Sequence, residues 1–170
     1  MIPNIIYEGS FWEGKLYLEK WNDFYGKDLQ LKLNVGGDRV VKQLTEVHQL
    51  GYSFLISQQK EILNIILNEV LDNYPTWQNE YGYDGKEKEI FMPDVSNVID
   101  LRQLLYPEKV FIMDVELEKM PYIGIQFTCR WDEEHGIGVM FHKDRVVKIG
   151  GADIAFMTWI AENDNGGSLV

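Results

Sequence analysis

A hydrophobic alternation near the C-terminal end is the feature that most constrains the fold. Every second residue from Ile123 to Trp131 is apolar, and the residues between them are glycine or polar. The same period of two recurs over Ile137–Phe141, and this period is typical of a half-buried strand. A short acidic segment joins the two stretches and ends at Gly136, a residue that readily adopts the positive φ a reversal requires. The sequence therefore predicts an antiparallel hairpin with its tip at residues 132–136.

Shorter apolar stretches predict further strands on both sides of the chain's centre. In the N-terminal third, residues 5–7, 11–18 and 29–35 are separated by turn residues and predict an antiparallel meander. Towards the C-terminus, a strand is expected to begin at 110–113, and another at 146–149 follows the hairpin.

The central part of the chain predicts helices. Residues 40–50 indicate a short helix broken at Gly51, and a second helix begins near Ser53 or Ser57, where serine can cap it. Apolar residues recur in this second helix at steps of three and four, which gives it one wide apolar face. We expect it to end before Pro75, because proline lacks the amide hydrogen that an interior position donates.

The order of these segments is strands, then helices, then strands. This order is typical of an α+β domain, in which two or more helices pack on one face of an antiparallel sheet. A chain of 170 residues fits one such domain, spanning residues 1–170, with a sizeable core.

Composition limits the classes of function. The formal net charge is −11, which argues against nucleic acid as a ligand, because phosphate contacts need clustered lysine and arginine. An acidic surface instead favours a basic protein partner or a cation, and the alternative is that the acidity serves only solubility. The single cysteine, Cys129, lies on the apolar side of its stretch and is expected to be a core residue rather than a nucleophile. We expect no cofactor, no membrane-spanning segment and a cytoplasmic location.

The candidate functional residues fall in two separate segments. The hairpin tip combines one large ring with three carboxylates and an imidazole, and the segment 76–92, which we expect to be a loop, carries further aromatic rings. The candidate binding residues are Trp131, Asp132, Glu133, Glu134 and His135 at the tip, and Trp77, Tyr81 and Tyr83 in the loop. Exposed rings beside acidic groups suit the anchoring of a basic protein.

Two other interpretations of the tip compete with binding. A metal-dependent or acid-base enzyme would use Asp132, Glu134 and His135, with help from His142 or Asp153, although no metal-ligand spacing is present. In a purely structural role, Asp132 and Glu133 would accept hydrogen bonds from turn amides while His135 packs against Trp131.

The C-terminal segment resembles a known group of proteins. The string Trp131–Val139, followed by Val146–Gly150 and Asp153–Ala155, is similar to an uncharacterised family of small bacterial domains that close with an acidic-residue-Glu-His-Gly hairpin. The similarity covers residues 123–156. Related small acidic α+β domains look like immunity proteins, which neutralise toxins exchanged between bacteria. The resemblance implies a binding role and does not imply any catalytic residues in this chain.

Overall fold

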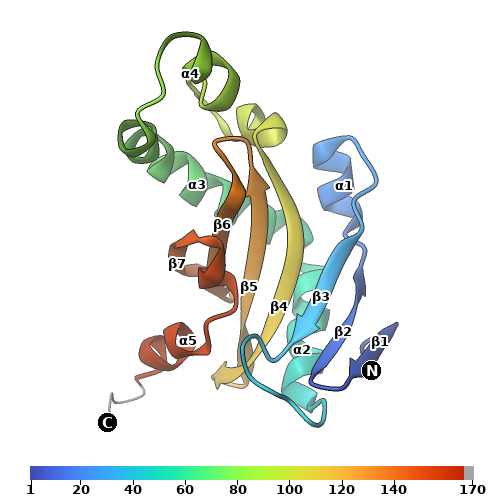
Figure 1. The fold of residues 1–170 in the computed structure, drawn as a ribbon. Coiled ribbons are helices and arrows are strands. Elements are labelled where there is room, and N and C mark those ends of the chain that lie inside the picture. The colour runs from blue at the N-terminus through green and yellow to red at the C-terminus, as the bar shows by residue number, and fades with distance from the viewer. Residues whose placement is uncertain (167–170) are drawn as a thin grey trace.

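The computed structural model describes residues 1–166 and contains one seven-stranded sheet whose strands follow the chain in order, β1 to β7 (Figure 1). The strands are β1 (Ile5–Glu8), β2 (Phe11–Leu16), β3 (Leu31–Val35), β4 (Leu105–Leu117), β5 (Met120–Cys129), β6 (Asp132–His142) and β7 (Arg145–Gly151). Every neighbouring pair is antiparallel except β3 and β4, which are parallel. The predicted α+β class is confirmed.

Helices lie against both faces of the sheet. They are α1 (Glu19–Tyr25), α2 (Glu46–Ser57), α3 (Gln59–Tyr81), α4 (Gly85–Phe91), the 3₁₀ helix η1 (Val98–Gln103), the 3₁₀ helix η2 (Ala152–Ala155) and α5 (Thr158–Asp164). In Figure 1, α2 and α3 lie behind the sheet, as the prediction of helices on one face requires, while α5 lies in front of it. The short η2 packs on the same front face, where the backbone of Ala155 lies against Gly124 of β5.

The parallel pair follows from the long connection between its strands. After β3, the chain forms α2, α3, α4 and η1 before it returns as β4. A connection of this length can carry the chain back to the starting end of the sheet, which a tight hairpin cannot do. The predicted antiparallel arrangement is therefore right for all pairs but this one.

The two faces of the sheet support cores of different size. The larger core packs Leu55, Ile66 and Val70 of the rear helices against Val110 and Ile125 of the sheet, all of them fully buried. A smaller cluster on the front face joins side chains of the sheet to those of η2 and α5. Its buried members are Phe111, Met113, Tyr122, Met140, Ile154, Ala155, Ile160 and Ala161.

The helix boundaries differ from the predicted ones. Helix α2 begins at Glu46 and runs through Gly51, where a predicted break is wrong. A Cβ at Gly51 would lie 2.4 Å from the ring of Pro121, so the missing side chain lets α2 approach β5. The predicted end before Pro75 is also wrong, since α3 contains Pro75 and continues to Tyr81.

The segment 76–92 is therefore helical for most of its length, in the last turns of α3 and in α4, and the predicted loop is wrong. Helix α1, which follows β2 and buries Trp21, is not among the predicted helices. None of the helices in residues 1–166 combines the length and the apolar character needed to cross a membrane.

Candidate functional site

The predicted hairpin is present, but its turn lies two residues earlier than expected. Cys129 pairs with Asp132, so the turn consists of Arg130 and Trp131. Beyond this turn, residues 133–136 of β6 face a single residue of β5, because Ile137 already pairs with Phe127. The acidic segment is thus a bulge in β6, and the bulge projects its side chains away from the sheet.

Gly136 closes this bulge. Its φ is +73°, a left-handed conformation that side chains other than glycine adopt rarely. A Cβ at this position would also lie 2.3 Å from the carbonyl oxygen of Phe127. The positive φ expected for a reversal at Gly136 is therefore present, although it serves a bulge rather than the turn itself.

Asp132 holds the bulge together. Its Oδ1 accepts a hydrogen bond from the backbone N–H of His135 at 3.1 Å and lies 2.9 Å from Nδ1 of the same residue. Asp132 accepts a hydrogen bond from a backbone amide, as predicted, but this amide lies in the bulge rather than in the turn. The imidazole of His135 contacts this carboxylate, and its side chain remains 70% exposed.

Trp131 lies beneath the tip instead of at its surface. It is only 1% exposed, and its ring packs between Tyr74, at 5.4 Å between ring centroids, and Trp77, at 6.0 Å. The expectation of an exposed Trp131 is wrong, because its ring lies in the core together with the buried apolar residues of β5. Trp131 can support the tip but does not reach a partner.

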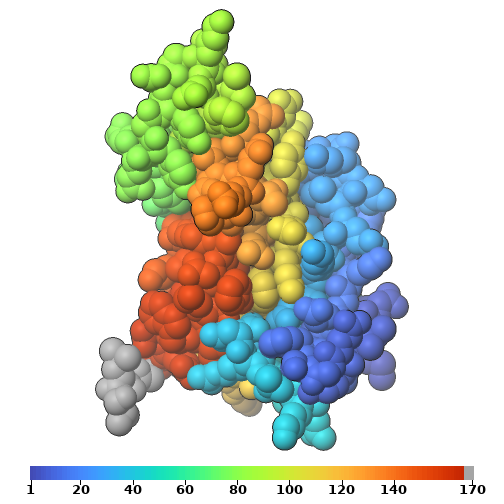
Figure 2. Space-filling model, in the orientation of Figure 1, coloured from blue at the N-terminus to red at the C-terminus, as the bar shows by residue number. Residues whose placement is uncertain are grey.

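The helical extension beyond Pro75 brings the two predicted segments together. The hydroxyl of Tyr81 donates to Oδ2 of Asp132 at 2.8 Å, and the hydroxyl of Tyr83 donates to the carbonyl oxygen of Trp131 at 3.0 Å. The rings of Tyr81 and Tyr83 stack with 6.2 Å between centroids. In Figure 2 the green helical region borders the orange hairpin in the upper part of the molecule.

These residues surround a shallow depression with a volume of about 430 Å³. We call it the tip depression; it is lined by Tyr81, Tyr83, Phe91, Arg130, Trp131, Asp132, Glu133, Glu134 and His135. Seven of these nine are predicted site residues. The sequence reasoning missed Phe91 and Arg130, although Phe91 belongs to the same aromatic segment and its ring lies 5.4 Å from that of Tyr83.

Hydrogen bonding determines the charge state of the tip depression. Burial raises the pKa of Asp132, but the hydrogen bonds from Tyr81 and His135 outweigh it and hold the pKa of this carboxyl below its ordinary value. The hydrogen bond to Asp132 raises the pKa of His135. Burial and the bond to the same carboxylate raise the pKa of Tyr81. The contacts from Tyr81 and His135 thus favour the charged form of Asp132, while the side chains of Glu133 and Glu134 are exposed to solvent.

The helper residues of the enzyme interpretation lie elsewhere. His142 is at the far end of β6, and its Nε2 lies 3.0 Å from the carbonyl oxygen of Leu117. It lies seven positions beyond His135 along β6, which corresponds to about 20 Å along an extended strand. Asp153 belongs to η2, on the front face of the sheet. Within residues 1–166, no group of three or more His, Cys, Asp and Glu side chains is arranged to hold a metal ion.

Two further titratable groups are buried away from solvent. Cys129 is buried, as predicted, and burial raises the pKa of its thiol to about 12. Nε2 of His48 lies 3.0 Å from Oδ1 of Asp114, between α2 and β4. Burial lowers the pKa of His48, although Asp114 opposes the shift.

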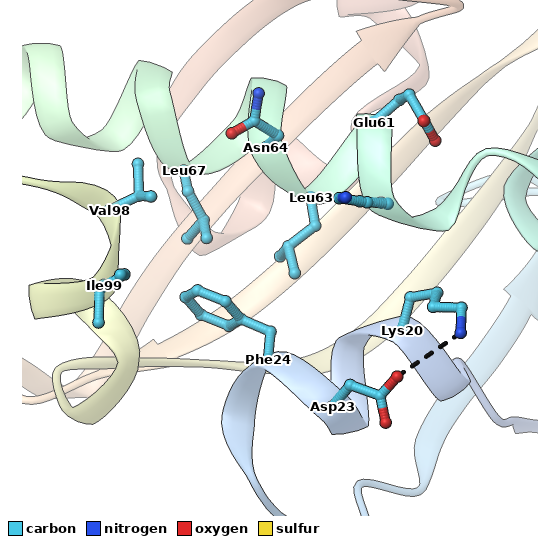
Figure 3. Close-up of a pocket in the computed structure, with 10 residues that line it drawn as sticks. Lys20, Asp23, Phe24, Glu61, Leu63, Asn64, Leu67, Val98 and Ile99 are labelled. Carbon is cyan, nitrogen blue, oxygen red and sulfur yellow. Dashed lines mark ion pairs between the residues drawn. The ribbon is translucent and has the colours of Figure 1, made fainter.

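A larger cavity, of about 610 Å³, lies between α1, α3 and η1 (Figure 3). The side chains of Phe24, Leu63 and Leu67 point toward one another and form an apolar floor (Figure 3). On its rim, Lys20 pairs with Asp23 at 3.6 Å. The charged groups on the rim are balanced in sign, so this cavity shows no preference for a charged ligand.

Fold and site together define an α+β domain with a mostly antiparallel sheet and an acidic, aromatic hairpin tip. A family described as a domain of unknown function (DUF6985) matches residues 2–157, and the chain belongs to this family. The predicted membership in a family of unknown function is confirmed, over most of the chain. The family description includes no immunity role. No curated protein matches the chain, and no solved structure matches it.

Proposed function

We propose that this domain binds a basic protein through the tip depression. One observation carries the proposal: the fold brings two exposed carboxylates, Glu133 and Glu134, next to the stacked rings of Tyr81 and Tyr83. Tyr81 is 41% exposed, so its ring can contact a partner. Aromatic side chains are common anchors of protein interfaces, and complementary charge speeds the encounter.

The chemistry of the depression suggests what it accepts. A volume of about 430 Å³ suits one or two side chains rather than a whole element of a partner. A lysine or arginine side chain could place its charge beside Glu133 and Glu134 and its apolar stem on the rings, in contacts that include cation–π attraction. If the basic partner is a bacterial toxin that this binding neutralises, the domain is an immunity protein.

The test is capture from a bacterial lysate with three baits: the intact protein, the variant Glu133→Lys/Glu134→Lys, and a control, Glu8→Lys/Asp72→Lys. The control reverses two exposed carboxylates outside the tip depression, so it makes the same change in net charge. We expect a basic protein that the intact and control baits retain and the tip variant loses. With the purified partner, the tip variant should reduce the association rate about tenfold or more at low salt.

Equal retention by all three baits, or loss from both variants, would contradict binding at the tip. All three proteins should first give the same circular dichroism spectrum and thermal midpoint. This requirement is realistic, because the side chains of Glu133 and Glu134 are exposed and form no ion pair within residues 1–166.

Acid–base catalysis at the same site is the second candidate. The contact of 2.9 Å between Asp132 and His135 favours it, because a carboxylate can orient an imidazole and raise its basicity. Binding is the better supported of the two, since His135 stands in solvent rather than in an enclosed cleft. A hydrolase activity that His135→Gln abolishes and Glu133→Lys/Glu134→Lys leaves intact would support catalysis instead.

A further inference from the structure

A second charged surface lies on the front face of the sheet, far from the rear helices. Leu31 and Leu33 of β3 point into the larger core behind the sheet, so Lys32 between them points to the front. In Figure 1, the front of β3 and the upper part of β4 lies open, while α5 lies in front of the sheet near its other edge. In Figure 2 the light-blue and yellow side chains of these strands form the visible surface.

Three lysines face one another across this open surface. Lys15 of β2 pairs in register with Lys32 of β3, and Lys32 pairs with Lys109 of β4. We call these three residues the lysine row. Side chains directly opposite one another on neighbouring strands have Cβ atoms about 5 Å apart, and like charges in this arrangement repel. The repulsion is notable in a chain with only 16 lysines and arginines against 27 acidic residues.

The acidic residues of the sheet neutralise this row only in part. Lys109 pairs with Glu13 at 3.2 Å, and Lys32 lies 3.8 Å from Glu108 while its side chain remains 68% exposed. Lys15 is exposed and has no ion pair within the described residues 1–166. The row thus retains positive charge toward solvent.

Polar groups continue the surface on the neighbouring strands. Gln126 of β5 pairs with Lys109, and Thr128, two residues further along the same face, pairs with Tyr106. A fourth lysine, Lys27, lies over the ring of Tyr106 with its Nζ 3.7 Å from the ring centroid. The open part of the face is therefore basic and hydrogen-bonding, and it differs in sign from the tip depression.

We propose that the lysine row binds an acidic segment of a protein partner. Carboxylates placed beside the exposed Lys15 and Lys32 would offset the repulsion between these two facing ammonium groups, and this favours the bound state. A short acidic segment fits better than nucleic acid, because the net charge of −11 repels a long polyanion while contacts within a Debye length of about 8 Å stay attractive. This surface is independent of the tip depression, and its role does not depend on the function proposed above.

The test uses fluorescently labelled octaglutamate as the probe and anisotropy as the readout, with the intact protein and two variants. Lys15→Gln/Lys32→Gln removes two members of the row. The control, Lys60→Gln/Lys86→Gln, removes two exposed lysines of α3 and α4, so both variants have the same net charge. We expect the row variant to bind the probe about tenfold more weakly than the intact protein, and the control to bind within about twofold of it.

Three results would overturn the proposal. They are no binding of octaglutamate by the intact protein, equal binding by the row variant, and equal loss in the control. A different outcome is that a single-stranded oligonucleotide binds more tightly than octaglutamate and loses its binding in the row variant. That result would identify nucleic acid, rather than an acidic protein segment, as the ligand of the lysine row. Self-association of the intact protein that the row variant abolishes would assign the face to a second copy. Matching circular dichroism spectra and urea midpoints show that each variant is folded before binding is compared.

Discussion

Trp131 shows how one buried side chain supports the tip from beneath. Its ring is fully buried against Tyr74 and Trp77. We expect Trp131→Ala to lower the free energy of unfolding by about 3–5 kcal/mol, because it removes a large buried ring and leaves a cavity. Urea denaturation followed by circular dichroism measures this change. Trp131→Phe should lower the free energy of unfolding clearly less, since it keeps a ring in place. A decrease below about 1 kcal/mol for the alanine variant would show that the surrounding side chains close the cavity without strain.

The contact between Asp132 and His135 makes the tip sensitive to pH. The pKa of His135 is raised in the folded protein. The stabilisation that charged His135 provides is therefore complete below the ordinary histidine pKa, and it is lost as the pH rises through the pKa that His135 has in the folded protein. The pKa of Asp132 is lowered, so the contribution is present above the ordinary aspartate pKa and is lost as pH falls through the folded value. The pair therefore stabilises the tip most between about pH 4 and pH 6.

Two measurements check this window. Titration of His135 by NMR should give a pKa that falls toward 6.5 in the Asp132→Asn variant, because the neutral amide no longer favours the imidazolium. The thermal midpoint of the intact protein should exceed that of His135→Gln near about pH 5.5, and the difference should vanish near about pH 9. A difference that grows toward high pH would contradict the sign of the interaction.

At the scale of secondary-structure elements, the docking of α2 on the sheet depends on the absence of a side chain. Gly51 lies against Pro121, so Gly51→Ala should destabilise the protein by about 1–2 kcal/mol even though alanine favours a helix by about 1 kcal/mol. Ser53→Ala, at an exposed position of the same helix, is the matched control and should stabilise slightly. Urea midpoints measure both. A stabilised Gly51→Ala variant would mean that the proline ring moves freely.

The same position shows where sequence reasoning reaches its limit. The strands of the hairpin were predictable because a period of two reports burial on one face, which is a local property. Gly51 and Pro75 are expected to end helices because each of them costs free energy inside a helix, but tertiary packing outweighs this cost. After Pro75, the rings of Trp77 and Tyr81 contact Trp131 and Asp132, contacts between segments more than 50 residues apart that no local pattern encodes.

The candidate site was predictable in composition but not in arrangement. The acidic residues and rings identified both segments, yet the two-residue turn at Arg130 and Trp131 and the bulge after it depend on the register between β5 and β6. The lysine row was invisible for the same reason. Lys15, Lys32 and Lys109 lie far apart in the chain, and only the register of three strands aligns them.

At the scale of the whole molecule, charge is distributed unevenly. The carboxylates Glu133 and Glu134 lie at the hairpin tip, while the lysine row lies across β2, β3 and β4. The net charge of −11 nevertheless dominates at long range, and self-repulsion of this kind destabilises a compact state.

Salt should therefore stabilise the isolated domain. Raising sodium chloride from about 20 mM to about 500 mM shortens the Debye length from about 20 Å to about 4 Å, so repulsion among the acidic groups is screened. We expect the thermal midpoint to rise by a few degrees, as measured by circular dichroism. The rise should be smaller in Glu133→Lys/Glu134→Lys, because that variant is less acidic and has less repulsion to screen. A midpoint that falls with salt would mean that attractive pairs such as Lys109 with Glu13 outweigh the net charge, and that local pairing rather than total charge determines the electrostatics of this domain.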